Sequence, residues 1–177
     1  MGGGVGCAIA LPVVRELHEM GCEVTSIVGF RSKDLVILED EFRAASDKFV
    51  MMTDDGSYGE KGNVTLPLKR MLEAGETFDR VITIGPLVMM KFVALATKEY
   101  NIPTIASMNP IMIDGTGMCG GCRLTVGGET KFACVDGPDF DAHLVDFDEA
   151  MKRSRTYAEF EAKAREKHCN LFKKEAN

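Results

Sequence analysis

Apolar residues recur at helical and at strand-like spacing, in alternation, through residues 2–108. Helical spacing runs over 6–20, 33–45, 63–74 and 87–100, and short apolar runs lie at 23–29, 48–53, 80–85 and 104–108. Strands that alternate with helices indicate βαβ units and a parallel sheet. We therefore predict an α/β fold with a doubly wound parallel sheet, the architecture that commonly binds dinucleotides.

Cap residues mark the ends of the expected helices. Gly21 follows the first helix, as a residue that tolerates positive φ. Ser32 precedes the second helix and Asn63 the third, and both side chains can accept a bond from a free N–H of the first turn. These residues predict where each helix begins or ends.

The glycine-rich turn at 2–6, Gly-Gly-Gly-Val-Gly, opens the first helix. In doubly wound folds such a turn follows a central first strand, yet only Met1 precedes it here. We therefore expect that the first strand, and whatever came before it, is missing from the chain.

The pattern changes after residue 108. Strand-like segments at 123–126 and 130–133 flank Gly127-Gly128, a two-residue hairpin signal, and residues from 147 onward are charged and helix-prone. The sequence predicts a dinucleotide-binding domain at 1–108, a metal-cluster domain at 109–146 and a helical tail at 147–177.

The most specific motif is Asp114-x4-Cys119-x2-Cys122-x11-Cys134. Plant-type [2Fe–2S] sites use C-x4-C-x2-C…C, and this chain keeps the spacing with a carboxylate in place of the first thiolate. We predict a [2Fe–2S] cluster held by these four residues. A structural zinc site and a redox Cys-x-x-Cys remain alternatives, and Asp114 could instead be a turn residue.

Candidate nucleotide-binding residues follow the expected strands. The glycine turn offers backbone N–H groups to a pyrophosphate, and the loops after later strands offer cations, carboxylates and a second close approach. Each set also has a structural interpretation. The glycine turn could be a flexible start and the cations could be solvated charges. The aspartates could be turn residues, and the methionine could be a core residue. The candidates are Gly3, Gly4, Gly6, Arg31, Lys33, Asp54, Asp55, Gly85, Pro86 and Met89.

Composition narrows the function classes. The 177 residues carry a net charge of −6 without a Lys/Arg stripe, which argues against a nucleic-acid partner. No apolar stretch approaches the length of a bilayer span, so we expect no membrane partner. The six cysteines are unevenly spread, which favours a reducing cytoplasm. We expect Cys7, Cys22 and Cys169 to be packing or surface residues.

These motifs together resemble the ferredoxin–NADP reductase family over residues 2–172. The resemblance is carried by Gly-Gly-Gly-Val-Gly at 2–6, Thr-Asp-Asp-Gly-Ser-Tyr-Gly-Glu-Lys-Gly at 53–62 and Asp-Gly-Thr-Gly-Met-Cys-Gly-Gly-Cys at 114–122. Within that family the chain is similar to the small subunit of electron-bifurcating NADH-dependent ferredoxin:NADP oxidoreductase. A related group, the electron-transfer subunits of dihydroorotate dehydrogenase, has cysteine where this chain has Asp114.

The resemblance implies a function. It implies binding of NAD(H) or NADP(H), hydride transfer to FAD on an N-terminal barrel that this chain lacks, and one-electron transfer through the cluster. It further implies a large flavin and iron–sulfur partner subunit, with ferredoxin reached indirectly. Two alternatives stay open: a dihydroorotate dehydrogenase electron-transfer subunit, and a non-catalytic nucleotide- or redox-sensing iron–sulfur module.

Overall fold

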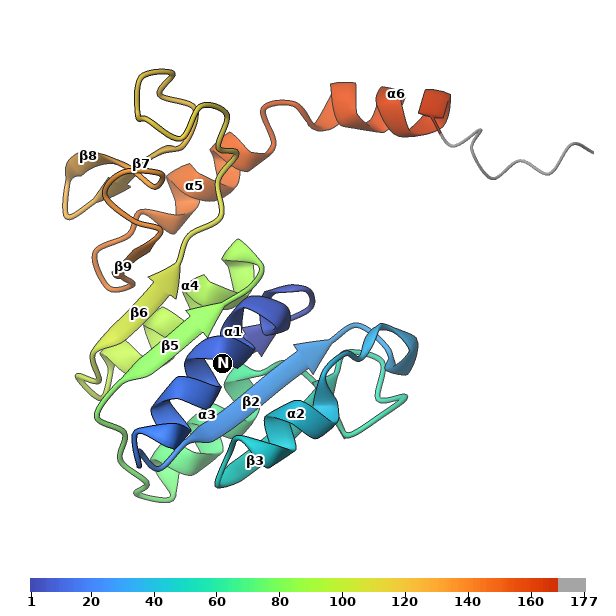
Figure 1. Ribbon diagram of the computed structural model, residues 1–177, viewed down its shortest axis with the longest axis vertical. Helices are drawn as coiled ribbons and strands as arrows, with labels where there is room; N and C mark the ends of the chain where they lie inside the picture. The colour runs from blue at the N-terminus through green and yellow to red at the C-terminus, as the bar shows by residue number, and fades with distance from the viewer. Residues whose placement is uncertain (169–177) are drawn as a thin grey trace, which may run out of the picture.

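The computed structural model describes residues 1–168, and the last nine positions of the expected helical tail lie outside the described residues. A seven-stranded sheet has the order β4-β3-β2-β1-β5-β6-β9, and a separate hairpin pairs β7 with β8 (Figure 1). The strands are β1 (Gly2–Gly3), β2 (Thr25–Phe30), β3 (Lys48–Thr53), β4 (Glu60–Lys61), β5 (Val81–Ile84), β6 (Thr104–Ser107), β7 (Arg123–Val126), β8 (Glu129–Phe132) and β9 (Asp139–Asp141).

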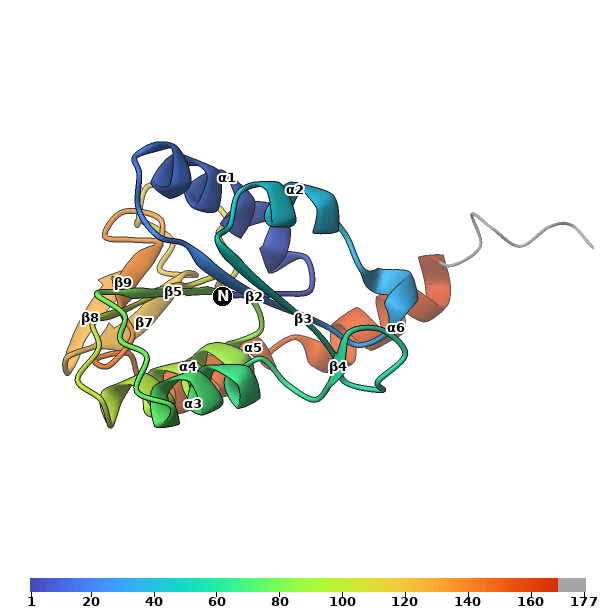
Figure 2. The same ribbon diagram turned by 90° about the horizontal axis from the view of Figure 1, so that it is seen from below.

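Helices cover both faces of the sheet. Figure 2 shows α1 and α2 on one face and α3 and α4 on the other. The helices are α1 (Gly6–Glu19), the 3₁₀ turn η1 (Lys33–Leu35), α2 (Glu39–Ala44), α3 (Thr65–Glu73), α4 (Leu87–Lys98), α5 (Phe147–Ser154) and α6 (Ala158–His168). The doubly wound α/β fold predicted from the sequence is confirmed.

The order of the strands reverses at the centre of the sheet. Strand β1 pairs in parallel with β2 on one side and with β5 on the other, so chain order runs outward both ways from the glycine turn. The central place expected for a strand ending at these glycines is therefore occupied by β1, which is two residues long. In open α/β sheets, ligands bind outside the carboxyl ends of the strands at such a switch point.

One predicted helix is wrong in extent. Instead of a continuous helix over 33–45, the chain forms η1, an extended residue at Val36, and then α2 after Leu38, whose φ is 59°. Val36 and Leu38 pack against the core beside α1, so burial of these side chains overrides helical propensity. Ser32 occupies the N-cap position of η1, but its side chain makes no capping bond.

Strand β9 was not predicted. It pairs antiparallel with β6 and places Phe140 opposite Ala106. Three residues with one buried side chain between two aspartates carry too little periodicity to be recognised in a sequence. The pairing returns the chain from the cysteine region to the edge of the sheet.

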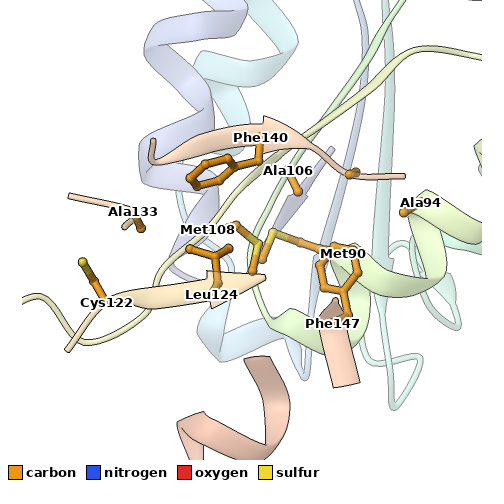
Figure 3. Close-up of a cluster of buried hydrophobic side chains, with 10 residues drawn as sticks. Met90, Ala94, Ala106, Met108, Cys122, Leu124, Ala133, Phe140 and Phe147 are labelled. Carbon is orange, nitrogen blue, oxygen red and sulfur yellow. The ribbon is translucent and has the colours of Figure 1, made fainter. Parts of the chain in front are cut away.

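A single buried cluster joins the sheet to the cysteine region (Figure 3). It combines residues of α4 and β6 with residues of the β7–β8 hairpin, β9 and α5. Its buried members are Met90, Ala94, Ala106, Met108, Cys122, Leu124, Ala133, Phe140, Ala142 and Phe147. The expected boundary at 108/109 is therefore crossed by one continuous core.

Helix α5 is fixed to this body, whereas α6 extends away from it (Figure 1). The Asp146 carboxylate caps α5 by accepting a bond from Glu149 N–H, and Asp148 pairs with Lys91 of α4 at 2.7 Å. The helical tail is confirmed as far as residue 168. None of the described helices has the length and apolar character needed to cross a lipid bilayer.

Thr83, in the middle of β5, supplies a test of the core. Its side chain is 0% exposed, and within the described residues its hydroxyl has no hydrogen-bond partner. A buried polar group without a partner costs ~1–3 kcal/mol. We predict that Thr83→Val raises the free energy of unfolding by about 1 kcal/mol, measured by urea denaturation.

A matched control lies in α4. The Thr97 hydroxyl is equally buried but bonds the Val93 carbonyl and the Thr104 hydroxyl. Thr97→Val should therefore lower stability by about 1 kcal/mol. Equal destabilisation by both substitutions would contradict this account of Thr83.

Candidate functional site

The β7–β8 hairpin brings two cysteines together. Arg123 of β7 pairs with Phe132 of β8, and Ala133 N–H donates to the Cys122 carbonyl, so the hairpin brings Cys134, one residue further on, close to Cys122. Their sulfur atoms lie 3.2 Å apart, and Cys122 is 1% exposed. The pairing of the hairpin thus brings together two cysteines that are 12 positions apart in the sequence.

The other two candidate ligands form a second pair. The Asp114 carboxylate accepts bonds from the backbone N–H of Thr116 and of Cys119, each at 2.8 Å. These bonds hold the pKa of Asp114 below its ordinary value, with Thr116 N–H as the main cause. The Cys119 sulfur accepts a bond from Gly121 N–H at 3.4 Å.

Electrostatics couple the two pairs. The pKa of Cys134 is raised, first by its contact with the Cys122 thiol and then by burial, and the negative charge of Asp114 adds to the effect. Metal ligation requires these thiols to lose their protons. A cationic group bound among them would offset the repulsion that opposes deprotonation, so the donor set suits a metal cluster.

The four residues do not form a closed cage. Within residues 1–168, no group of three or more His, Cys, Asp or Glu side chains is arranged to hold a metal ion. Ligation by all four residues therefore stays a prediction. The turn role of Asp114, the alternative kept open above, is visible in its two backbone bonds, yet each carboxylate oxygen retains a further lone pair for a metal.

Two arginines hold the loop between Cys119 and Cys122. Arg123 donates to the Gly120 carbonyl and Arg153 to the Gly121 carbonyl, each at 3.3 Å. Neither arginine was predicted from the sequence. Arg153 lies 32 residues from its acceptor, on a different element, so no local pattern marks that contact. Arg123 lies only three residues from its acceptor, directly after Cys122.

Exposed apolar side chains surround the cysteine loop. Met118 is 90% exposed and Ile113 is 76% exposed, although both lie within a few residues of the candidate ligands. Exposed apolar side chains that gather in one region commonly mark an interaction site. The exposed members near the loop are Ile111, Met112, Ile113, Met118 and Val135.

The second candidate site is the glycine cradle at the switch point. A Cβ on Gly3 would overlap the Met89 sulfur and approach Pro86 Cδ to 2.9 Å. A Cβ on Gly85 would come within 3.0 Å of Gly3 Cα. The structure therefore brings Gly3, Gly85, Pro86 and Met89 into mutual contact, and only glycine permits this close approach of two strand ends.

Helix α1 begins at this cradle. Gly4 has φ of 53° and open space where a Cβ would lie, and its N–H donates to Gly29 O. Gly6 packs against β5, since a Cβ there would lie 2.5 Å from Ile84 O. Cys7 N–H and Ala8 N–H donate to the Gly4 and Val5 carbonyls, so the N–H groups of Val5 and Gly6 are the donors that this positive end of α1 can offer to a phosphate.

The loops after β2 and β3 meet beside the cradle. Lys33 N–H donates to the Ser57 hydroxyl at 2.8 Å, and Asp55 N–H donates to the Arg31 carbonyl at 3.3 Å. The Arg31, Lys33, Asp54 and Asp55 side chains are exposed. Ser57 also donates to Asp55, which lowers the pKa of that carboxyl and makes Asp54 the freer acceptor for a ribose hydroxyl.

Known proteins match this arrangement. Residues 109–146 match the iron–sulfur cluster binding domain of dihydroorotate dehydrogenase B. The chain is 48% identical over 161 residues to a Thermotoga maritima protein described as a homologue of the dihydroorotate dehydrogenase B (NAD(+)) electron transfer subunit. That alignment covers 91% of this chain and 56% of the relative.

Two further matches extend the comparison. An uncharacterised Clostridium beijerinckii protein is 53% identical over 163 residues, covering 92% of this chain and 55% of the relative. The structure of NADH-dependent reduced ferredoxin-NADP oxidoreductase, reported for flavin-based electron bifurcation, superposes with a TM-score of 0.87 at 42% identity. It covers 96% of this chain and 60% of that one.

These matches support an iron–sulfur cluster-binding domain at 109–146 on a ferredoxin reductase-type fold. The chain is related to electron-transfer subunits of oxidoreductases and spans a little over half the length of the curated relatives it matches.

Substitution of Asp114 separates ligation from turn formation. Asp114→Asn keeps an acceptor for Thr116 N–H but removes the anionic oxygen, and Asp114→Ala removes both. If Asp114 is a ligand, both variants should lose labile sulfide faster than the wild type, and Asp114→Cys should keep two irons with shifted absorption and electron paramagnetic resonance spectra. An Asn variant with wild-type spectra and cluster lifetime would leave Asp114 a turn residue only.

Arg31 provides the test of the nucleotide site. Arg31→Glu should weaken NADH binding by roughly tenfold or more, because hydrogen bonds to charged groups contribute ~1.5–3 kcal/mol. Arg15→Glu, an equal charge reversal on the exposed face of α1, is the control and should leave affinity unchanged. Calorimetric titration with NADH and NADPH measures both variants, and unchanged affinity in Arg31→Glu would remove Arg31 from the site.

Proposed function

We propose that this chain is the nucleotide-binding and [2Fe–2S] electron-relay part of a flavin oxidoreductase. One observation carries the proposal: neighbouring residues of α4 serve both sites. Met89 contacts the Gly3–Gly85 cradle, and Met90 packs in the same core as Cys122. A nucleotide and a cluster bound at these places would be held on one packed body.

The chemistry of the two sites calls for a flavin between them. A reduced nicotinamide gives up a hydride, which carries two electrons, whereas an iron–sulfur cluster accepts one electron at a time. FAD supplies the conversion between two-electron and one-electron transfer. We place FAD mainly on a separate domain, and assign to this chain the pyrophosphate cradle at Gly3, Gly4 and Gly6.

The residues present have defined tasks in this proposal. The first turn of α1 binds the pyrophosphate, Arg31 and Lys33 offer cations to the adenosine side, and Asp54 offers a carboxylate to a ribose hydroxyl. Asp114, Cys119, Cys122 and Cys134 hold the cluster. Arg31, rather than an acid, directly follows β2, so no carboxylate at that position rejects a 2′-phosphate. Both NADH and NADPH fit, and the resemblance favours NADH.

The apolar side chains around the cysteine loop support a protein partner at the cluster. We propose that Ile113 and Met118 dock against a larger flavin and iron–sulfur subunit, which carries electrons onward to ferredoxin. Burying two such side chains contributes ~1.5–3 kcal/mol each to association. The bifurcating oxidoreductase is the assembly we favour, because the structure reported for that enzyme matches 96% of this chain.

The electron-transfer subunit of dihydroorotate dehydrogenase is the second candidate. The match at residues 109–146 and the description of the Thermotoga maritima relative favour it. It differs in its partner, a flavoprotein that oxidises dihydroorotate. A third candidate, a nucleotide-binding redox sensor without turnover, requires binding of both groups but no electron transfer between them.

Anaerobic addition of NADH to the flavin-loaded complex, purified with its natural partners, distinguishes the three. We predict flavin bleaching followed by reduction of the cluster. Reduction of the cluster by dihydroorotate, with no transfer to ferredoxin, would favour the second candidate. NADH binding without bleaching of flavin or cluster would contradict the relay altogether.

A further inference from the structure

We propose that Arg153 of α5 is a positioning residue for the cluster, which fixes the loop between Cys119 and Cys122 and raises the reduction potential of the group bound there. This inference rests on the proposed function. Arg153 Nη2 donates to the Gly121 carbonyl at 3.3 Å. Gly121 directly precedes Cys122 in the sequence and lies two positions after Cys119, so the guanidinium is bound between the two candidate ligands.

The position of α5 is determined by contacts other than this one. Thr125 N–H of β7 donates to Glu149 at 3.1 Å, and Lys91 of α4 pairs with Asp148 at 2.7 Å. Phe147 is buried in the core that also contains Cys122. These contacts hold α5 without any contribution from Arg153. The position of the Arg153 guanidinium therefore follows from the packing of α5.

The charge of Arg153 is permanent and only partly screened. Arginine stays protonated at all accessible pH values, and Arg153 is half-buried. Charges that are partly removed from solvent interact more strongly than exposed ones. By comparison Arg123, which holds the neighbouring Gly120 carbonyl, is exposed, so its charge acts through more water.

A fixed cation near a cluster favours its reduced form. Reduction adds one electron and hence one negative charge, and the potential of iron–sulfur clusters depends on net charge and on hydrogen bonding around the sulfurs. The bond to Gly121 O fixes the peptide unit between Gly121 and Cys122, which lies beside the unit whose N–H donates to the Cys119 sulfur. Groups that orient a ligand in this way commonly affect both affinity and potential.

Lys152, the residue before Arg153, offers a matched control. Lys152 carries the same charge on α5, but it is exposed. Lys152→Gln and Arg153→Gln remove one positive charge each from neighbouring positions, so a general effect of net charge would appear in both. Arg153→Lys keeps the charge but replaces the planar fork by a single ammonium group.

The test is a redox titration of the cluster-loaded protein with dithionite and mediator dyes, monitored by electron paramagnetic resonance, beside the rate of sulfide loss in air. Arg153→Gln should lower the midpoint potential and shorten cluster lifetime, whereas Lys152→Gln should match the wild type. Arg153→Lys should keep the potential and show an intermediate lifetime. If Arg153→Gln retains no cluster, restoration of the cluster by Arg153→Lys supports the role of the charge.

Three results would count against these claims. Wild-type potential and lifetime in Arg153→Gln would overturn the inference, as would an equal fall in potential in Lys152→Gln. Failure of Arg153→Lys to restore a cluster lost in Arg153→Gln would overturn the electrostatic role. Absence of iron and labile sulfide from the wild-type protein would instead refute the proposed function, so the two failures are distinguishable.

Discussion

The packing of the first turn of α4 is the contact on which the rest of the structure depends. Met89 lies against the two glycines where β1 and β5 end, and Met90, with 0% exposure, lies in the core beneath the cysteine hairpin (Figure 3). Burial of a methionine side chain contributes ~1.5–3 kcal/mol. Two successive residues thus join the glycine cradle and the cysteine hairpin. In the proposed function, this contact would fix the separation between a bound nucleotide and a bound cluster.

The cysteine loop itself is held by hydrogen bonds between side chains and its backbone. Asp114 accepts two N–H bonds within the loop, and Arg123 and Arg153 each donate to one of its carbonyls. The apolar side chains of this loop point into solvent, which leaves them free for a partner. The candidate ligand positions are therefore held in place while apolar side chains near them are exposed, a combination that suits the proposed exchange of electrons with another subunit.

The sequence predicted those features that depend on local spacing. The hairpin over Gly127-Gly128 and the alternation of strands and helices follow from turn chemistry and from the geometry of parallel sheets. Features that depend on contacts between distant residues were missed. The break at Leu38 arises from burial of neighbouring side chains, β9 exists only through pairing with β6, and Arg153 acts across 32 residues. The four cluster ligands also remain a prediction, because only the spacing of Asp114, Cys119, Cys122 and Cys134 indicates that they bind one group.

Iron and acid-labile sulfide content of the anaerobically purified chain is the measurement that tests the central claim most directly. The account predicts about two irons and two sulfides per chain, with visible absorption from sulfide-to-iron charge transfer, in accord with the plant-type spacing of the ligands. One zinc ion per chain and no labile sulfide would contradict it, because the cysteine hairpin would then be a structural metal site without a role in electron transfer.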